Sequence, residues 1–258
     1  MYKNQLRFLA ASALTVCSLQ VFADEPASPL SFNVGVATEY RYRGLAQSSF
    51  KPALQGGADY ASPSGYYIGT WASTIDWIKD DGKTAGANTG STNVEIDLYG
   101  GYKGTTANGM GFDFGLLQYY YPSNKYSAIP GAANANTTEA YGALTVGVVT
   151  VKYSHSLTNL FGFGNSKGSG YLDMTATFDL GNGWSLAPHV GRQNIKGTNS
   201  IYSYSDASIT VGKDLGNGLS ASLMGVVTSN QNNWLTSTDY SQKSKGKAAL
   251  VAGLKYTF

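Results

Sequence analysis

The sequence contains few residues that bind metals or carry out nucleophilic chemistry. Cysteine occurs once, at Cys17, and histidine twice, at His155 and His189. Such small numbers argue against a zinc centre built from cysteines and histidines, and no cofactor is expected. Charged residues make up only 13% of the chain. Beyond the N-terminal region no run of eighteen apolar residues occurs, so no transmembrane helix is predicted.

The first 23 residues are predicted to be a secretory signal peptide. Lys3 and Arg7 give this segment a positive start, residues 8–16 are mostly apolar, and Ala23 provides the small residue at a cleavage site. Residues 14–17, which end in Cys17, resemble the recognition sequence of a lipoprotein signal peptide. However, Val16 is too large for the position before a lipidated cysteine. Cleavage after Ala23 leaves a chain without cysteine and therefore without a disulfide.

Cleavage of the signal peptide also removes the small net positive charge of the chain. Taking Lys3 and Arg7 from the 18 basic residues leaves 16, equal to the 16 acidic residues. A nucleic-acid-binding protein usually has a clear basic excess, so nucleic acid is not an expected partner.

Apolar and polar residues alternate through most of the remaining chain, which is the pattern of strands whose two faces meet different surroundings. At the C-terminus, Leu254, Tyr256 and Phe258 share one apolar face. We predict about twelve strands, at 32–43, 53–61, 66–76, 93–103, 111–121, 138–146, 149–157, 170–180, 184–193, 204–214, 219–228 and 247–258. The outward faces of the first and third strands are expected to hold Phe32, Val34, Val36, Tyr40 and Tyr42, and Tyr67, Trp71 and Ile75, respectively.

Short and long connections alternate between these strands. Asn182-Gly183 and Asn217-Gly218 lie in a repeated Asp-Leu-Gly-Asn-Gly segment and supply the positive φ angles of tight hairpin turns. The long connections at 77–92, 122–137 and 229–246 are expected to be polar loops. Short turns on one rim and long loops on the other are typical of outer-membrane barrels, as is a composition with 32 glycines and 19 tyrosines.

The predicted fold is therefore all-β, a transmembrane antiparallel up-and-down β-barrel of about twelve strands. The barrel is expected to span residues 31–258, after a flexible periplasmic lead-in at 24–30. A soluble β-sandwich or a lipocalin-like barrel is the alternative, and it would bury the same apolar faces in a protein core.

If the apolar faces meet lipid, the opposite faces line the lumen and carry the charges. Candidates for a pore constriction are Glu39, Arg41, Arg43, Asp59, Asp76, Glu95, Asp97 and Lys247. Further charges expected to face inward are Lys103, Asp113, Glu139, Lys152, Asp173 and Lys255. We expect Arg41 and Arg43 near the outer end of the first strand, beside Lys247 and opposite Glu95 and Asp97. Opposed charges orient polar solutes, whereas the alternative is that they only pair and pack the lumen.

Several segments resemble a known family. They are residues 32–47, 52–60, 69–73 and 95–102, which include an Arg-Tyr-Arg-Gly motif and a Glu-Ile-Asp-Leu-Tyr-Gly-Gly-Tyr motif. Together they resemble the TorF-type porins of Gram-negative bacteria, most strongly over residues 32–122. The resemblance implies an outer-membrane, porin-like barrel whose substrate is largely unassigned. The end of the chain also resembles the C-terminal signal of outer-membrane barrels, which implies that Leu254, Tyr256 and Phe258 are read by the barrel-assembly machinery.

The predicted function is passive diffusion of small polar solutes or ions through an outer-membrane channel, with membrane lipids, the assembly machinery and those solutes as partners. A structural or adhesion barrel with a closed lumen is the alternative. An enzyme is not expected, because a barrel lipid hydrolase needs a serine two residues from its histidine, and Leu157 occupies that position after His155. Ser185 is four residues from His189, too far along a strand for a direct hydrogen bond.

Overall fold

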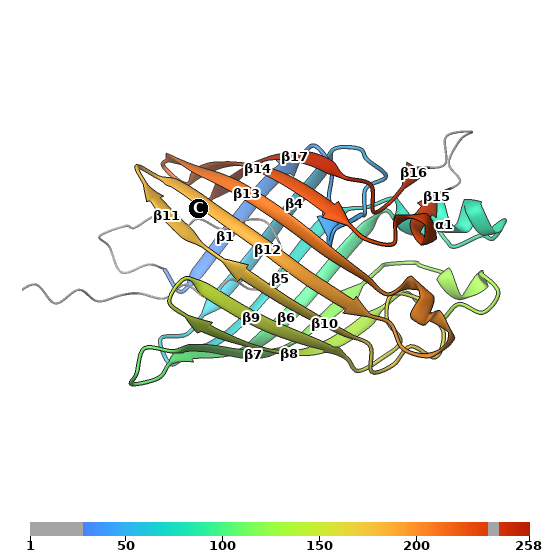
Figure 1. Cartoon of the computed structure of the whole chain (residues 1–258), viewed down its shortest axis with the longest axis horizontal. Helices are drawn as coiled ribbons and strands as arrows, with labels where there is room; N and C mark the ends of the chain where they lie inside the picture. The colour runs from blue at the N-terminus through green and yellow to red at the C-terminus, as the bar shows by residue number, and fades with distance from the viewer. Residues whose placement is uncertain (1–27, 237–242) are drawn as a thin grey trace, which may run out of the picture.

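The structure is a computed structural model that describes residues 28–236 and 243–258. Most of this part of the chain forms one antiparallel sheet, as the alternating residues predict (Figure 1). Its strands are β1 (Leu30–Ala37), β4 (Ala53–Ala61), β5 (Tyr66–Thr74), β6 (Val94–Thr105), β7 (Gly111–Tyr120), β8 (Thr137–Val146), β9 (Val149–Ser156), β10 (Gly170–Ala176), β11 (Phe178–Gly181), β12 (Trp184–Asn194), β13 (Tyr204–Gly216), β14 (Leu219–Thr228) and β17 (Ala249–Thr257). The predicted signal peptide lies outside the described residues.

The sheet closes on itself. β1 pairs with β4 on one side and with β17 on the other, and β10 and β11 together occupy one position beside β12. The result is a closed antiparallel barrel of 12 strands, which confirms the predicted fold class. At the seam, the backbones of Phe32 and Phe258 exchange two hydrogen bonds of 2.9 Å. Within the described residues the barrel sheet therefore has no free edge, which is the condition for spanning lipid with strands.

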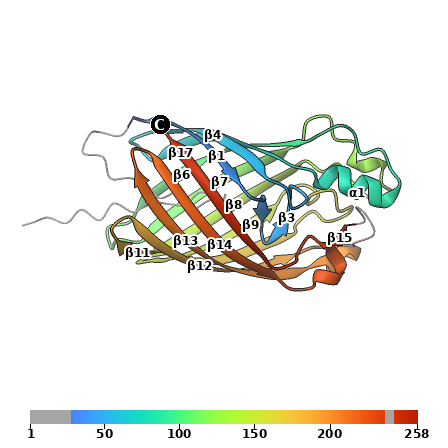
Figure 2. The ribbon, with the colours of Figure 1, turned by 90° about the horizontal axis from the view of Figure 1, so that it is seen from above.

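The two ends of the barrel differ, as Figures 1 and 2 show. The long connections at one end contain the helix α1 (Trp77–Ala85), the 3₁₀ helices η1 (Tyr126–Ala128), η2 (Gly197–Tyr202) and η3 (Gln231–Trp234), and two short hairpins, β2 (Arg41–Tyr42) with β3 (Leu45–Ala46) and β15 (Leu235–Thr236) with β16 (Lys243–Ser244). The C-terminus lies at the other end, with the tight turns. There Asn182 and Asn217 have φ angles of 51° and 52°, which confirms the predicted Asn-Gly turns.

No helix among the described residues has the length and apolar character needed to cross a membrane. The predicted polar loop at 77–92 is wrong in one respect, because α1 occupies its first half.

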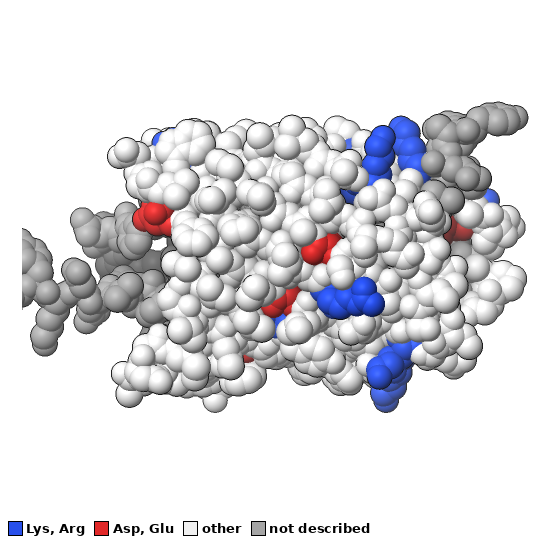
Figure 3. Space-filling model, viewed as in Figure 1, with Lys and Arg blue, Asp and Glu red and all other residues white. Residues whose placement is uncertain are grey.

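Apolar side chains cover the outer surface of the barrel and polar ones fill its interior. On β10, Leu172 and Met174 are exposed, whereas the neighbouring Tyr171 is buried. The face in Figure 3 carries few charged atoms, and most of its lysine and arginine atoms lie toward the end with the long loops. This distribution suits a barrel whose outer wall meets lipid.

The predicted face of the third strand is wrong. Tyr67 and Trp71 are only 8% and 6% exposed, and Ile75, beyond the end of β5, is also buried, whereas Ile68 is 65% exposed. The cause is aromatic packing in the lumen, where the Trp71 ring meets the edge of the Tyr40 ring at 5.4 Å. Aromatic residues occupy both faces of this strand, so alternation alone did not identify the outward one.

Spin labels on β5 test this face assignment. A label at Ile68→Cys is expected to collide readily with oxygen dissolved in the bilayer, whereas one at Tyr67→Cys is expected to be shielded inside the barrel. The matched pair Leu172→Cys and Asp173→Cys on β10 calibrates the two environments, because prediction and structure agree there. Greater oxygen accessibility at position 67 than at position 68 would contradict the structure.

Candidate functional site

The connection between β1 and β4 folds into the barrel. The predicted first strand, 32–43, ends at Ala37, and the following residues turn inward to form the β2–β3 hairpin. Arg43 and Gly44 at its tip have φ angles of 46° and 79°. A Cβ atom at Gly44 would lie 2.7 Å from the Cβ of Asp206 on β13, so the tip is pressed against the wall and needs glycine. We call residues 38–52 the inward hairpin.

The Arg43 side chain extends from the inward hairpin across the lumen to the opposite wall of the barrel. Its guanidinium donates to both carboxylate oxygens of Glu139 on β8, at 3.0 and 2.6 Å, and to Gln193 Oε1 on β12 at 2.8 Å. The Tyr171 ring of β10 lies 4.4 Å from the guanidinium carbon. The side chains of Arg43 and Glu139 are 5% and 1% exposed. This is a buried, bidentate charge pair that joins one loop to the far wall.

Arg41 holds the base of the inward hairpin. Its guanidinium lies 2.8 Å from Glu39 and donates to the backbone carbonyls of Lys245 at 2.7 Å and Lys247 at 3.0 Å. Lys247 precedes β17, and it contributes this carbonyl while its side chain is exposed. The hairpin is therefore tied to the last connection of the barrel by polar contacts.

Two predicted lumen acids, Glu95 and Asp97, do lie inside the barrel on β6. Glu95 accepts hydrogen bonds of 2.7 Å from the hydroxyls of Tyr40 and Tyr121. Asp97 is fully buried, and neither of its oxygens has a hydrogen-bond partner in the described part of the chain. Arg43, expected to lie opposite these two acids, binds a different one, Glu139. Tyr40, expected to face lipid, is also an interior residue.

Asp59 and Asp76 have different surroundings from one another. Asp59, on β4, accepts a hydrogen bond of 2.6 Å from the Tyr99 hydroxyl. Asp76 lies beyond the end of β5, immediately before α1, and pairs with Lys51 at 2.9 Å in a largely exposed contact. The expectation that Asp76 belongs to the strand wall is therefore wrong, because β5 ends at Thr74.

His189 belongs to a polar chain on the lumen wall. Its Nε2 lies 3.1 Å from Asp206 Oδ1, and its Nδ1 lies 3.0 Å from the hydroxyl of Thr175. The Tyr171 hydroxyl donates to the same aspartate at 3.0 Å. Ser185 does not contact this histidine; its buried hydroxyl has no partner among the described residues. Within residues 28–236 and 243–258 no three histidine, cysteine, aspartate or glutamate side chains gather to hold a metal ion.

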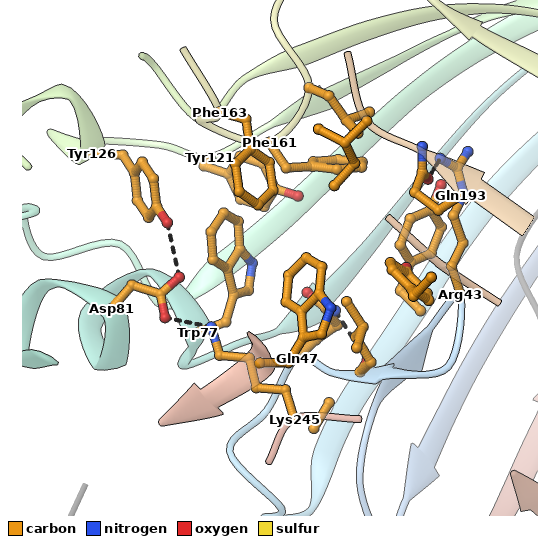
Figure 4. Close-up of a pocket in the computed structure, with 17 residues that line it drawn as sticks. Arg43, Gln47, Trp77, Asp81, Tyr121, Tyr126, Phe161, Phe163, Gln193 and Lys245 are labelled. Atoms are coloured by element: carbon orange, nitrogen blue, oxygen red, sulfur yellow. Dashed lines mark hydrogen bonds and ion pairs between the residues drawn. The ribbon is translucent and has the colours of Figure 1, made fainter. Parts of the chain in front are cut away.

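Above the inward hairpin, the long loops enclose a cavity that we call the vestibule. It contains about 620 Å³ of space, including space open to solvent (Figure 4). Its aromatic lining consists of Tyr42, Trp77, Tyr121, Tyr126, Phe161, Phe163, Tyr204 and Trp234. Its polar lining includes Arg43, Gln47, Asp81, Gln193 and Lys245.

Loops from three connections meet at the rim of the vestibule. The Lys245 ammonium pairs with Asp81 of α1, and the Tyr126 hydroxyl donates to the same carboxylate at 2.9 Å. Burial, reinforced by Asp81, raises the pKa of Tyr126 well above its usual value, so its hydroxyl remains a neutral donor. None of these residues is among the site residues predicted from the sequence, because the long connections are expected to be polar loops. The local sign of an aromatic site is the presence of Trp77, Tyr126 and Trp234 within those connections.

The fold is similar to that of solved porins. A KdgM porin aligns with a TM-score of 0.52 and 7% identity over 88% of this chain and 99% of that one. A KdgM porin in complex with disordered oligogalacturonate aligns at 0.51 and 8%, over 89% and 98%. A NanC porin aligns at 0.51 and 7%, over 88% and 98%. At such identities the likeness establishes the barrel fold.

Sequence comparison adds the family. No curated protein matches the sequence. A family model described as "Bacterial protein of unknown function (Gcw_chp)" matches residues 23–258, which is nearly the whole chain. The chain therefore belongs to the Gcw_chp family.

Proposed function

We propose that this protein is an outer-membrane channel for small polar solutes or ions, and that the inward hairpin forms its constriction. The observation that carries the proposal is the position of Arg43. The Arg43 side chain reaches across a lumen lined by polar and charged side chains. It also forms part of the lining at the bottom of the vestibule. The porin fold supports the channel, and the apolar outer wall supports a location in the outer membrane of a Gram-negative bacterium.

The inward hairpin holds charged groups inside the lumen by two kinds of contact. Arg41 and Arg43 reach the wall through charge pairs and hydrogen bonds, and Tyr40 packs in a buried aromatic cluster. In this proposal Glu39, Arg41, Arg43, Glu95 and Asp97 supply the fixed charge of the narrow region, with Asp59 deeper in the barrel and Asp76 and Lys247 at its loop end. Membership of the TorF-type porins remains a prediction within this proposal.

A closed-lumen barrel is the second candidate. The burial of Glu139 and Asp97 favours it, because a wide aqueous channel would leave such carboxylates hydrated. Conductance separates the two candidates, since only the first allows ions to pass.

Planar-bilayer recordings of the refolded protein provide that test. We expect a small conductance for the wild type and one several-fold larger when residues 40–47 are replaced by a short glycine-serine linker, because the linker removes the lumen-spanning Arg43. The control is Lys51→Ala, which removes an exposed ion pair and is expected to leave the conductance unchanged. If neither the wild type nor the linker variant conducts, the lumen is closed and the channel proposal is wrong.

The Arg43–Glu139 pair is expected to dominate the stability of the inward hairpin. Arg43→Met alone leaves Glu139 buried without its partner and should lower the free energy of unfolding by about 3–5 kcal/mol. The double variant Arg43→Met with Glu139→Gln should lose less, because no unpaired charge remains. Urea unfolding in lipid vesicles measures both values, and Lys51→Met should cost less than about 1 kcal/mol. Equal losses in the single and double variants would show that the two side chains do not depend on each other.

We also propose that the end of β17 is the assembly signal. Leu254, Tyr256 and Phe258 expose their side chains on the outer wall, and Phe258 pairs with Phe32 across the seam. Deleting Phe258 is expected to reduce the amount of heat-modifiable barrel in the outer membrane several-fold. Phe178→Ala, which truncates another exposed phenylalanine of the outer wall, is the matched control. An undiminished amount of folded barrel after the deletion would contradict this role.

A further inference from the structure

Two tryptophans that line the vestibule have indole N–H groups without acceptors. Trp77 is 6% exposed, and within the described residues no hydrogen-bond partner exists for its Nε1 or for that of Trp234. Figure 4 shows Trp77 between Tyr126 and Gln47, inside the vestibule. A buried donor without an acceptor is unfavourable, so an incoming oxygen atom that accepts from it gains affinity.

Each tryptophan stands in an aromatic cluster. The Trp77 and Tyr126 rings lie 5.3 Å apart, and the Trp234 ring lies 5.3 Å from Tyr204 and 5.9 Å from Phe163. The face of an aromatic ring is negative and attracts polarised C–H groups. The lining of the vestibule therefore places aromatic rings beside unpaired N–H donors.

The charges that line the vestibule are already paired. Lys245 binds Asp81, and Arg43 binds Glu139 and Gln193. An ionic ligand would have to displace one of these pairs, whereas a neutral ligand leaves them intact. Part of the vestibule is open to solvent, so a ligand can enter it from the loop end.

We propose that the vestibule binds a neutral, hydroxylated six-membered ring, that is, an uncharged sugar of pyranose size. The C–H face of the sugar stacks on the aromatic lining, and its hydroxyl oxygens accept from Trp77 and Trp234. The inference deepens the proposed channel by naming its solute class, and it rests on that function for passage through the barrel. Binding itself needs only the vestibule.

Calorimetric titration of the refolded full-length protein in detergent tests the site. The probes are methyl glucoside, glucuronate and cyclohexanol, which differ in charge and in the number of hydroxyl groups on similar rings. We expect methyl glucoside to bind most tightly. Trp77→Phe keeps an aromatic ring but removes the N–H donor, and it should weaken binding about threefold to tenfold, the worth of one hydrogen bond.

Two further variants make the result interpretable. Trp234→Phe should weaken binding similarly, so the test does not depend on one substitution. Trp184→Phe, on the exposed outer face of β12, is the matched control and should leave affinity unchanged. A heat-modifiable band on gels confirms that each variant is folded.

Three results would overturn the inference: no binding of methyl glucoside, binding of glucuronate or cyclohexanol at least as tight, or unchanged affinity in both vestibule variants. Failure of the channel is distinguishable, because it is measured as conductance. A protein that binds the sugar without conducting keeps the vestibule site and contradicts the channel. A protein that conducts without binding contradicts the vestibule site alone.

Discussion

The architecture depends on closure of the sheet between β1 and β17. In lipid every backbone N–H and carbonyl needs a partner within the protein, and only a closed sheet meets that condition with strands. The paired backbones of Phe32 and Phe258 complete the seam at the turn end, and the remaining β1–β17 register continues it to Ala37. Once the wall is closed, each strand has an outer side and a lumen side, and its alternating residues are sorted between them.

The sorting creates the main energetic problem of the interior. Charged side chains on the lumen side are buried in a narrow interior, where an ionised group needs a partner. Glu139 is satisfied by Arg43, and Glu95 by two tyrosine hydroxyls. Neither partner of Glu95 comes from a barrel strand, since Tyr40 and Tyr121 lie in connections. Loops thus complete the polar interior, and the aromatic vestibule is built by the same loops farther out.

Much of the wall could be predicted from the sequence, because alternation reports burial directly. The alternation of residues along their strand predicts that Glu95 and Asp97 face the lumen. The Asn-Gly pairs, which adopt positive φ angles, predict the positions of the tight turns. The first strand is predicted to end at residue 43 but ends at Ala37, because the inward hairpin continues the same alternation through Arg41. Gly44 is the local sign of the turn in that hairpin.

The candidate site was less predictable than the wall. Arg43 and Glu139 are 96 residues apart, and no local pattern links them. The vestibule residues lie on loops and short helices without periodicity, so their convergence depends on the closed barrel rather than on any single segment.

The partners of the inward hairpin have a consequence for the order in which the molecule can form. Arg43 belongs to the first connection, but Glu139 and Gln193 are contributed by β8 and β12, and the carbonyls that hold Arg41 lie more than 200 residues later, just before the last strand. The Arg43 contacts therefore need β8 and β12, whereas the Arg41 contacts also need the connection that precedes β17. The complete set of polar contacts that holds the inward hairpin can therefore form only late, after nearly all of the chain has been made.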